Sequence, residues 1–107
     1  ETRNEADKVW VIGVDRDQTE EGAYTSKDGK ESNFVLASTL KQVGAAVKDI
    51  ATKAENGEFP GGEIVRYTLA DKGVELAETN LSDDAAKAVA DAKQAILDGK
   101  IEVPEKP

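Results

Sequence analysis

The stretch that decides the fold is Val9-Trp10-Val11-Ile12-Gly13-Val14, a continuous apolar run that stops at Asp15. Apolar and polar residues do not alternate in this run, which is typical of a strand whose two faces are both covered by helices. We therefore predict a buried strand of a parallel sheet. Because ligands of such sheets bind beyond the carboxyl ends of the strands, Asp15 stands where a ligand site would form.

Strand and helix signals follow one another along the rest of the chain. A polar segment with glycines, residues 16–32, predicts a long loop, and residues 33–37 predict a second strand. Ser38 is a suitable N-cap for a helix whose apolar residues recur every three or four positions until Asn56-Gly57. The remaining predicted elements are strands over residues 64–69, 74–77 and 101–103, a turn over 71–73, and a helix capped by Ser82 and closed by Gly99. This order indicates an α/β fold.

Composition excludes several chemistries. The chain has 107 residues and a formal charge of −8, which argues against nucleic acid or an anionic membrane surface as a partner. It contains no cysteine and no histidine, so it holds no disulfide, no thiolate nucleophile and no Ser-His-Asp triad. The spacing of the carboxylates and lysines does not require catalysis. We therefore predict no enzyme, no metal and no cofactor, and a core that is thin for a free-standing domain.

Two charged residues are candidates for a binding site. The Asp15 carboxylate has two acceptor oxygens that can bridge the vicinal hydroxyls of a sugar, although an aspartate here can also cap its own loop. Lys41 is predicted in the first turn of the helix after Ser38, where a cation opposes the helix dipole. Such violations of local rules occur at functional sites, but an exposed lysine lying along the surface is the plainer alternative. Calcium needs more oxygen ligands than the segment around Asp15 and Asp17 offers, so we expect no metal ion there. The Asp17 side chain is expected to be solvated instead.

Four segments in this order resemble one known family. They are VWVIGVDRDQ (residues 9–18), NFVLASTLKQVGAAV (33–47), GEFPGGEIVRYTLADKGVEL (57–76) and AILDGKIEVP (95–104). Together they resemble the basic membrane protein family, the PnrA-like nucleoside-binding lipoproteins that serve bacterial ABC transporters. The resemblance implies a type I periplasmic-binding-protein fold, with Rossmann-like lobes, a mostly parallel sheet flanked by helices, and the solute held between two lobes.

The resemblance also implies which residues bind the ligand. Asp15 matches the family's aspartate that accepts hydrogen bonds from the ribose hydroxyls, and Lys41 matches a lysine near the ligand. Asp17 and Gln18 match the motif and are expected to have a supporting role only. Family members are about three times as long as this chain, as two lobes require. Residues 1–107 are therefore expected to be the C-terminal segment, about one third, of a two-lobed solute-binding protein.

The function implied is that of the substrate-binding component of an ABC importer that binds purine or other nucleosides. Its partners would be the nucleoside and the permease and ATPase subunits. It would lie on the extracytoplasmic face of the bacterial cell membrane, held by a lipid anchor upstream of Glu1. The alternative is a small acidic regulatory domain of the receiver kind, which would bind magnesium at Asp15 and Asp17.

Overall fold

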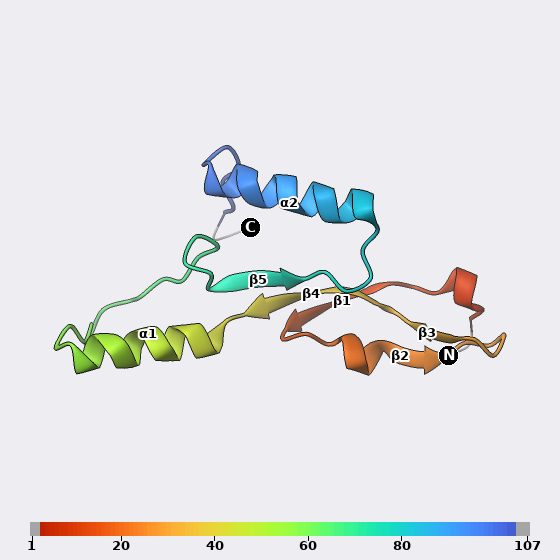
Figure 1. Cartoon of the computed structure of the whole chain (residues 1–107), viewed down its shortest axis with the longest axis horizontal. Coiled ribbons are helices and arrows are strands. Elements are labelled where there is room, and N and C mark those ends of the chain that lie inside the picture. The colour runs from red at the N-terminus through yellow and green to blue at the C-terminus, as the bar shows by residue number, and fades with distance from the viewer. Residues whose placement is uncertain (1–2, 105–107) are drawn as a thin grey trace.

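A computed structural model describes residues 3–104 of the chain. A three-stranded sheet lies at the centre, with helix α2 along one side, helix α1 at one end and a small hairpin at the other end (Figure 1). The elements are the short 3-10 helices η1 (Glu5–Asp7) and η2 (Thr19–Gly22), the strands β1 (Val11–Asp15), β2 (Ala23–Thr25), β3 (Glu31–Asn33), β4 (Val35–Lys41) and β5 (Val74–Ala77), and the helices α1 (Val43–Glu55) and α2 (Asp83–Leu97).

The central sheet has the strand order β1-β4-β5. β1 and β4 run parallel, whereas β4 and β5 run antiparallel, so a mixed sheet replaces the mostly parallel sheet expected for this segment. β4 is the middle strand and carries the buried apolar side chains of the described part of the chain, Val35 and Ala37. The α/β class predicted from the sequence is confirmed.

β1 is the strand predicted from the apolar run, but the prediction that both of its faces are buried is wrong. Ile12 and Val14 are 58% and 57% exposed, and Gly13 is the one buried residue of the strand. The physical reason is that β1 is an outer strand of the sheet, and neither α1 nor α2 contributes a buried residue. Ile12 and Val14 are therefore left uncovered within residues 3–104.

The boundary between β4 and α1 lies later than predicted. β4 continues to Lys41, so Ser38 is a strand residue and not a helix N-cap. Helix α1 begins at Val43, after Gln42, whose side chain makes no capping hydrogen bond. The strand continues because β4 pairs with a neighbour on each side, β1 up to Leu40 and β5 up to Lys41. The predicted end of the helix is confirmed by Gly57, which has a φ of 77°.

The predicted loop over residues 16–32 contains ordered elements. Helix η2 is followed by β2 and β3, which pair antiparallel as a hairpin with Tyr24 opposite Ser32. Polar groups hold the hairpin: the Ser26 hydroxyl accepts a hydrogen bond from the Lys30 backbone amide at 3.1 Å, and the Asn33 side chain donates to the Thr19 carbonyl at 2.7 Å. Such hydrogen bonds between polar side chains and the backbone leave no apolar periodicity, so the sequence pattern could not reveal the hairpin.

Two predicted strands, residues 64–69 and 101–103, do not form. A strand needs a neighbour to pair with, and the described residues offer neither segment one. The Tyr67 hydroxyl instead donates to the Asp49 carboxylate on α1 at 2.8 Å. Helix α2 forms as predicted, because the Ser82 hydroxyl accepts a hydrogen bond from the Ala85 amide at 3.3 Å. The predicted turn before β5 is also present, with Lys72 at a φ of 56°.

The shape of the molecule reflects this thin core. Its radius of gyration is 18.3 Å and its extents are 60 × 30 × 26 Å. A compact domain of this length has a radius of gyration of about 13 Å, so the chain is extended. No helix among residues 3–104 combines the length and apolar character needed to cross a membrane.

Candidate ligand-binding site

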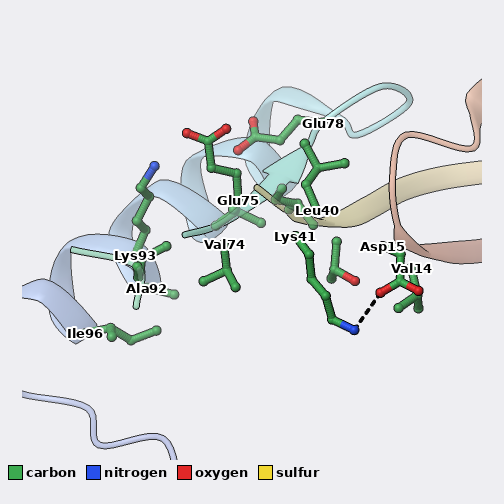
Figure 2. A pocket seen from close by; sticks show the side chains of 14 residues that line it. Val14, Asp15, Leu40, Lys41, Val74, Glu75, Glu78, Ala92, Lys93 and Ile96 are labelled. Atoms are coloured by element: carbon green, nitrogen blue, oxygen red, sulfur yellow. Dashed lines mark ion pairs between the residues drawn. The ribbon is translucent and has the colours of Figure 1, made fainter. Parts of the chain in front are cut away.

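The two residues predicted to bind a ligand lie side by side. Asp15 ends β1 and Lys41 ends β4, and because these strands are parallel their carboxyl ends meet at one edge of the sheet. The Lys41 Nζ lies 2.7 Å from the Asp15 Oδ1, and Figure 2 shows the lysine side chain extending toward the carboxylate. The two side chains are 66% and 64% exposed, so both charged groups remain accessible to a ligand.

Lys41 lies beside Asp15 because it ends a strand, and not because it begins a helix as predicted. It is the last residue of β4 and not a residue in the first turn of α1, so it does not oppose the helix dipole. Its position at the end of a strand adjacent to β1 is what places its ammonium group beside Asp15. The predicted conflict between Lys41 and the helix dipole is therefore wrong, although the residue that it singled out does lie at the strand ends.

Asp15 has an unusual backbone conformation. Its φ is 77°, in the left-handed region that aspartate tolerates better than most residues other than glycine. The chain turns sharply here at the end of β1. Conformations of this kind are costly and persist where the surrounding structure imposes them, often at binding sites.

A cavity of about 650 Å³ opens beside this pair, between the strand ends and α2 (Figure 2). This volume lies within the range of about 300–1,000 Å³ that is usual for small-molecule sites. Its lining residues are Val14, Asp15, Thr39, Leu40, Lys41, Leu69, Val74, Glu75, Leu76, Glu78, Val89, Ala92, Lys93 and Ile96. The cavity thus combines an apolar surface with a few charged groups, which is the composition expected of a site for a small organic ligand.

Asp17 and Gln18 do not line this cavity. The Asp17 Oδ1 accepts hydrogen bonds from the Thr19 amide at 3.0 Å and the Thr19 hydroxyl at 2.5 Å. These hydrogen bonds, the one from the Thr19 hydroxyl first, lower the pKa of the Asp17 carboxyl. The Gln18 Oε1 accepts from the Val14 amide at 2.9 Å. Both side chains therefore stabilise the loop after β1.

The contribution of α2 to the cavity could not be predicted from the sequence. The apolar spacing of Val89, Ala92 and Ile96 predicts a core-facing stripe of the helix, but these residues line the cavity. Nothing in the sequence distinguishes the two roles, because the spacing of the apolar residues is the same for both. Residues 3–104 contain no group of three or more carboxylates that could hold a metal ion.

A parallel strand pair with charged side chains at its carboxyl ends, next to an apolar cavity, is the arrangement of an α/β ligand-binding protein. Comparison with known proteins specifies the class. The model of the family described as "ABC transporter substrate-binding protein PnrA-like" matches residues 1–107, and the chain belongs to this family. The resemblance noted in the sequence is thereby confirmed.

Three curated relatives illustrate the match. The chain is 60% identical over 105 residues to the "ABC transporter nucleoside-binding protein BmpA" of Lactococcus lactis subsp. cremoris, covering 98% of the chain and 30% of the relative. It is 52% and 50% identical over 101 residues to the "CD4+ T-cell-stimulating antigen" of Listeria monocytogenes and of Listeria innocua, covering 92% of the chain and 28% of each relative. The chain thus spans less than a third of the length of these relatives.

Proposed function

We propose that this chain is the C-terminal segment of a two-lobed protein that binds a nucleoside for an ABC importer. The observation that carries the proposal is the Asp15–Lys41 pair, which lies at the carboxyl ends of two parallel strands and lines a cavity. Membership of a substrate-binding family supports it, and so does the relative that is named a nucleoside-binding protein. We refer to the full-length polypeptide that would contain residues 1–107 as the intact protein.

The chemistry of the pair suits a sugar. The Asp15 carboxylate would accept hydrogen bonds from the vicinal hydroxyls of the ribose, and the exposed Lys41 ammonium would donate to ligand oxygens beside it. A buried polar group left without a partner costs about 1–3 kcal/mol, so these two side chains would favour ligands that carry the hydroxyls.

The remaining parts of the proposal concern the whole protein. Ile12 and Val14 on β1, and Val43 and Val47 on α1, are exposed apolar residues that the rest of the two-lobed fold would cover. The protein would capture its ligand by closure of the lobes and deliver it unchanged to the permease and ATPase subunits, so it would not be an enzyme. It would lie on the extracytoplasmic face of the cell membrane, held by a lipid anchor upstream of Glu1.

The receiver-like alternative has less support. It requires the carboxylates of Asp15 and Asp17 to share a magnesium ion, but each has another partner: Asp15 pairs with Lys41, and Asp17 accepts hydrogen bonds from Thr19. Membership of a substrate-binding family also favours a binding protein over a regulatory domain.

The test is an Asp15→Ala substitution in the intact protein, with guanosine and adenosine binding measured by calorimetry. We expect the affinity to fall at least about tenfold, or about 1.4 kcal/mol, because the ribose hydroxyls lose their charged acceptor. Asp91→Ala is a matched control, because Asp91 forms a similar exposed pair with Lys87 at 2.6 Å and does not line the cavity. An Asp15→Ala protein that binds both nucleosides as tightly as the unsubstituted protein would refute the assignment.

A further inference from the structure

The turn that comes after β1 is closed by a side chain that does not reach the cavity. The side-chain oxygen Oε1 of Gln18 accepts a hydrogen bond from the Val14 backbone amide at 2.9 Å. The backbone amide of Gln18 donates to the Ser38 hydroxyl at 3.1 Å. Gln18 therefore contacts the residue before Asp15 through its side chain and strand β4 through its backbone. The chain between Val14 and Gln18, which contains Asp15, is held at both ends.

The space around this turn is tightly filled. Ser38 is fully buried, with 0% exposure, at a position of β4 opposite Gly13. A Cβ atom placed on Gly13 would lie 2.5 Å from the Ser38 Oγ and 2.7 Å from the Gln18 Oε1. Both distances are far too short for non-bonded atoms, so only glycine at position 13 lets Gln18 and Ser38 occupy these positions. We call Gly13, Gln18 and Ser38 the turn clamp.

The turn clamp explains why Asp15 adopts its left-handed conformation. With a φ of 77°, Asp15 reverses the chain so that Gln18 can return to the amide of Val14. A non-glycine residue keeps such a conformation only where its surroundings impose it. If the amide oxygen of Gln18 were removed, the Val14 amide would lose its partner, and the turn would be free to relax toward a more favourable φ at Asp15.

We infer that Gln18 is a positioning residue: through the turn clamp it holds the Asp15 carboxylate toward Lys41 and the cavity. This inference rests on the proposed function for its ligand, because it makes Gln18 a determinant of the preference for nucleosides with vicinal ribose hydroxyls. Gln18 itself does not touch the ligand. Its effect on binding passes entirely through the orientation of Asp15.

The ligand test compares guanosine with 2′,3′-dideoxyguanosine, which lacks both hydroxyls, by calorimetry on the intact protein. Gln18→Met keeps the length of the side chain and removes the acceptor, whereas Gln18→Glu keeps an acceptor oxygen for the Val14 amide. We expect Gln18→Met to lower the ratio of guanosine affinity to dideoxyguanosine affinity by about tenfold and Gln18→Glu to restore it to within about threefold. An equal loss of affinity for both ligands in Gln18→Met would overturn the inference, since a merely structural role predicts that result.

A control and a second measurement separate this inference from the proposed function. Gln94→Met is the control, because Gln94 lies on α2 and donates its side-chain amide to Asp98 at 2.7 Å, outside the cavity lining. Backbone carbon chemical shifts of Asp15, measured by NMR without ligand, should move away from left-handed values in Gln18→Met and stay unchanged in Gln94→Met. Unchanged Asp15 shifts in Gln18→Met would refute the positioning role. If the unsubstituted protein binds no nucleoside, the proposed function fails while the shifts still decide the role of Gln18.

Discussion

At the scale of single residues, the geometry of the site depends on how closely β1 approaches β4 at Gly13. The carbonyl of Gly13 accepts a hydrogen bond from the Thr39 hydroxyl at 3.3 Å, and the Ser38 hydroxyl fills the space beside its α-carbon. A side chain at this position would push against a fully buried neighbour. The glycine therefore permits the strand contact on which the position of Asp15 depends.

This contact predicts a stability effect for Gly13→Ala in the intact protein. The added methyl group must displace Ser38 or Gln18, and overpacking of this kind costs about 1–3 kcal/mol in the free energy of unfolding. Gly44→Ala is the control, because a Cβ on Gly44 meets no atom within 4 Å and alanine favours the helix α1 by up to about 1 kcal/mol. Urea unfolding measures both. A Gly13→Ala protein as stable as Gly44→Ala would contradict the packing at Gly13.

The position of one site residue could be predicted from the sequence, but its partner and its backbone conformation could not. The position of Asp15 followed from the strand-end rule, because the apolar run before it is a strong local signal. The pairing of Asp15 with Lys41 did not follow, because it depends on the register of two strands separated by the β2–β3 hairpin. Asp15 also has a left-handed backbone, and the neighbouring hydrogen bonds that join Gln18 to Val14 and to Ser38 are encoded by no local pattern.

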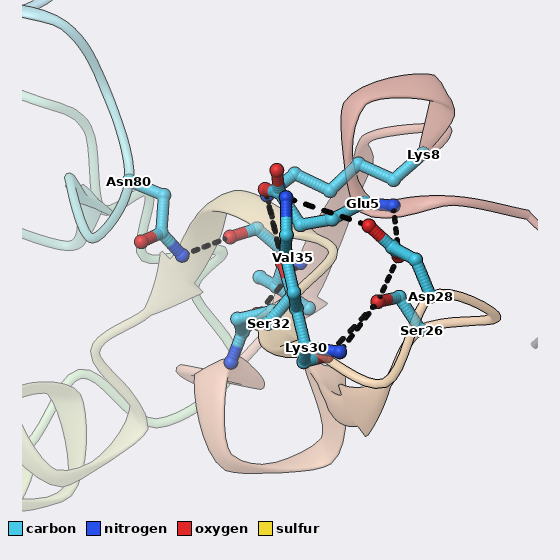
Figure 3. Close-up of polar contacts among 9 residues, drawn as sticks. Glu5, Lys8, Ser26, Asp28, Lys30, Ser32, Val35 and Asn80 are labelled. Atoms are coloured by element: carbon cyan, nitrogen blue, oxygen red, sulfur yellow. Dashed lines mark hydrogen bonds and ion pairs between the residues drawn. The ribbon is translucent and has the colours of Figure 1, made fainter.

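At the scale of elements, polar hydrogen bonds hold the β2–β3 hairpin to the start of the chain (Figure 3). Asp28 is central, because its Oδ1 accepts from the Ser26 hydroxyl at 2.6 Å and from the Glu5 amide at 3.0 Å. Lys8 adds a second link, donating to Ser32 at 3.0 Å and pairing with Glu5 at 3.0 Å. The hairpin is thus fixed by charged and polar groups at its turn and at Ser32 in the middle of β3.

These contacts predict an acid-dependent change in the hairpin. The hydrogen bond from Ser26, followed by that from the Glu5 amide, lowers the pKa of the Asp28 carboxyl to about 2 from its usual value of 3.8. The folded pKa is depressed, so the stabilisation by Asp28 is present above about pH 4 and is lost as the pH falls through about 2. Carbon NMR of the Asp28 carboxyl should titrate with a midpoint near 2. In Asp28→Asn the hairpin amides should lose their dependence on pH in this range, and a midpoint near 4 in the unsubstituted protein would contradict the hydrogen bonding.

Helices could be predicted better than strands for a physical reason. Helix α2 has all its signals within its own sequence: the Ser82 cap, the acidic first turn of Asp83 and Asp84, and the regular apolar spacing. A strand is stable only when another strand pairs with it, and that partner is remote in sequence. Residues 64–69 have the composition of a strand, but no described strand pairs with them. The composition therefore predicted an element that the available pairings do not allow.

At the scale of the whole molecule, the chain has more apolar surface to bury than it can cover itself. Val43 and Val47 on α1 are exposed, and so is Ile64 in the segment after it. The thin core predicted from the composition is confirmed by the two apolar side chains buried among residues 3–104, Val35 and Ala37. This imbalance supports the proposal that the chain is one segment of a larger fold, as does the 30% of its Lactococcus relative that it spans.

If the proposal holds, the ligand site needs the rest of the proposed two-lobed protein. Asp15 and Lys41 are both mostly exposed, and the cavity beside them opens to solvent. A ligand in such a site keeps much of its contact with water, so the hydrogen bonds to Asp15 and Lys41 would contribute little net affinity. The isolated chain is therefore expected to bind nucleosides weakly or not at all.

The most direct test of the proposed function is a guanosine titration by calorimetry of the intact protein and of the isolated chain of 107 residues. We predict that the intact protein binds guanosine and that the isolated chain binds it at least about a hundredfold more weakly, a difference of about 2.7 kcal/mol. Adenosine serves as the second ligand. The absence of binding to the intact protein with either nucleoside, or binding by the isolated chain within a hundredfold of the affinity of the intact protein, would contradict the proposal.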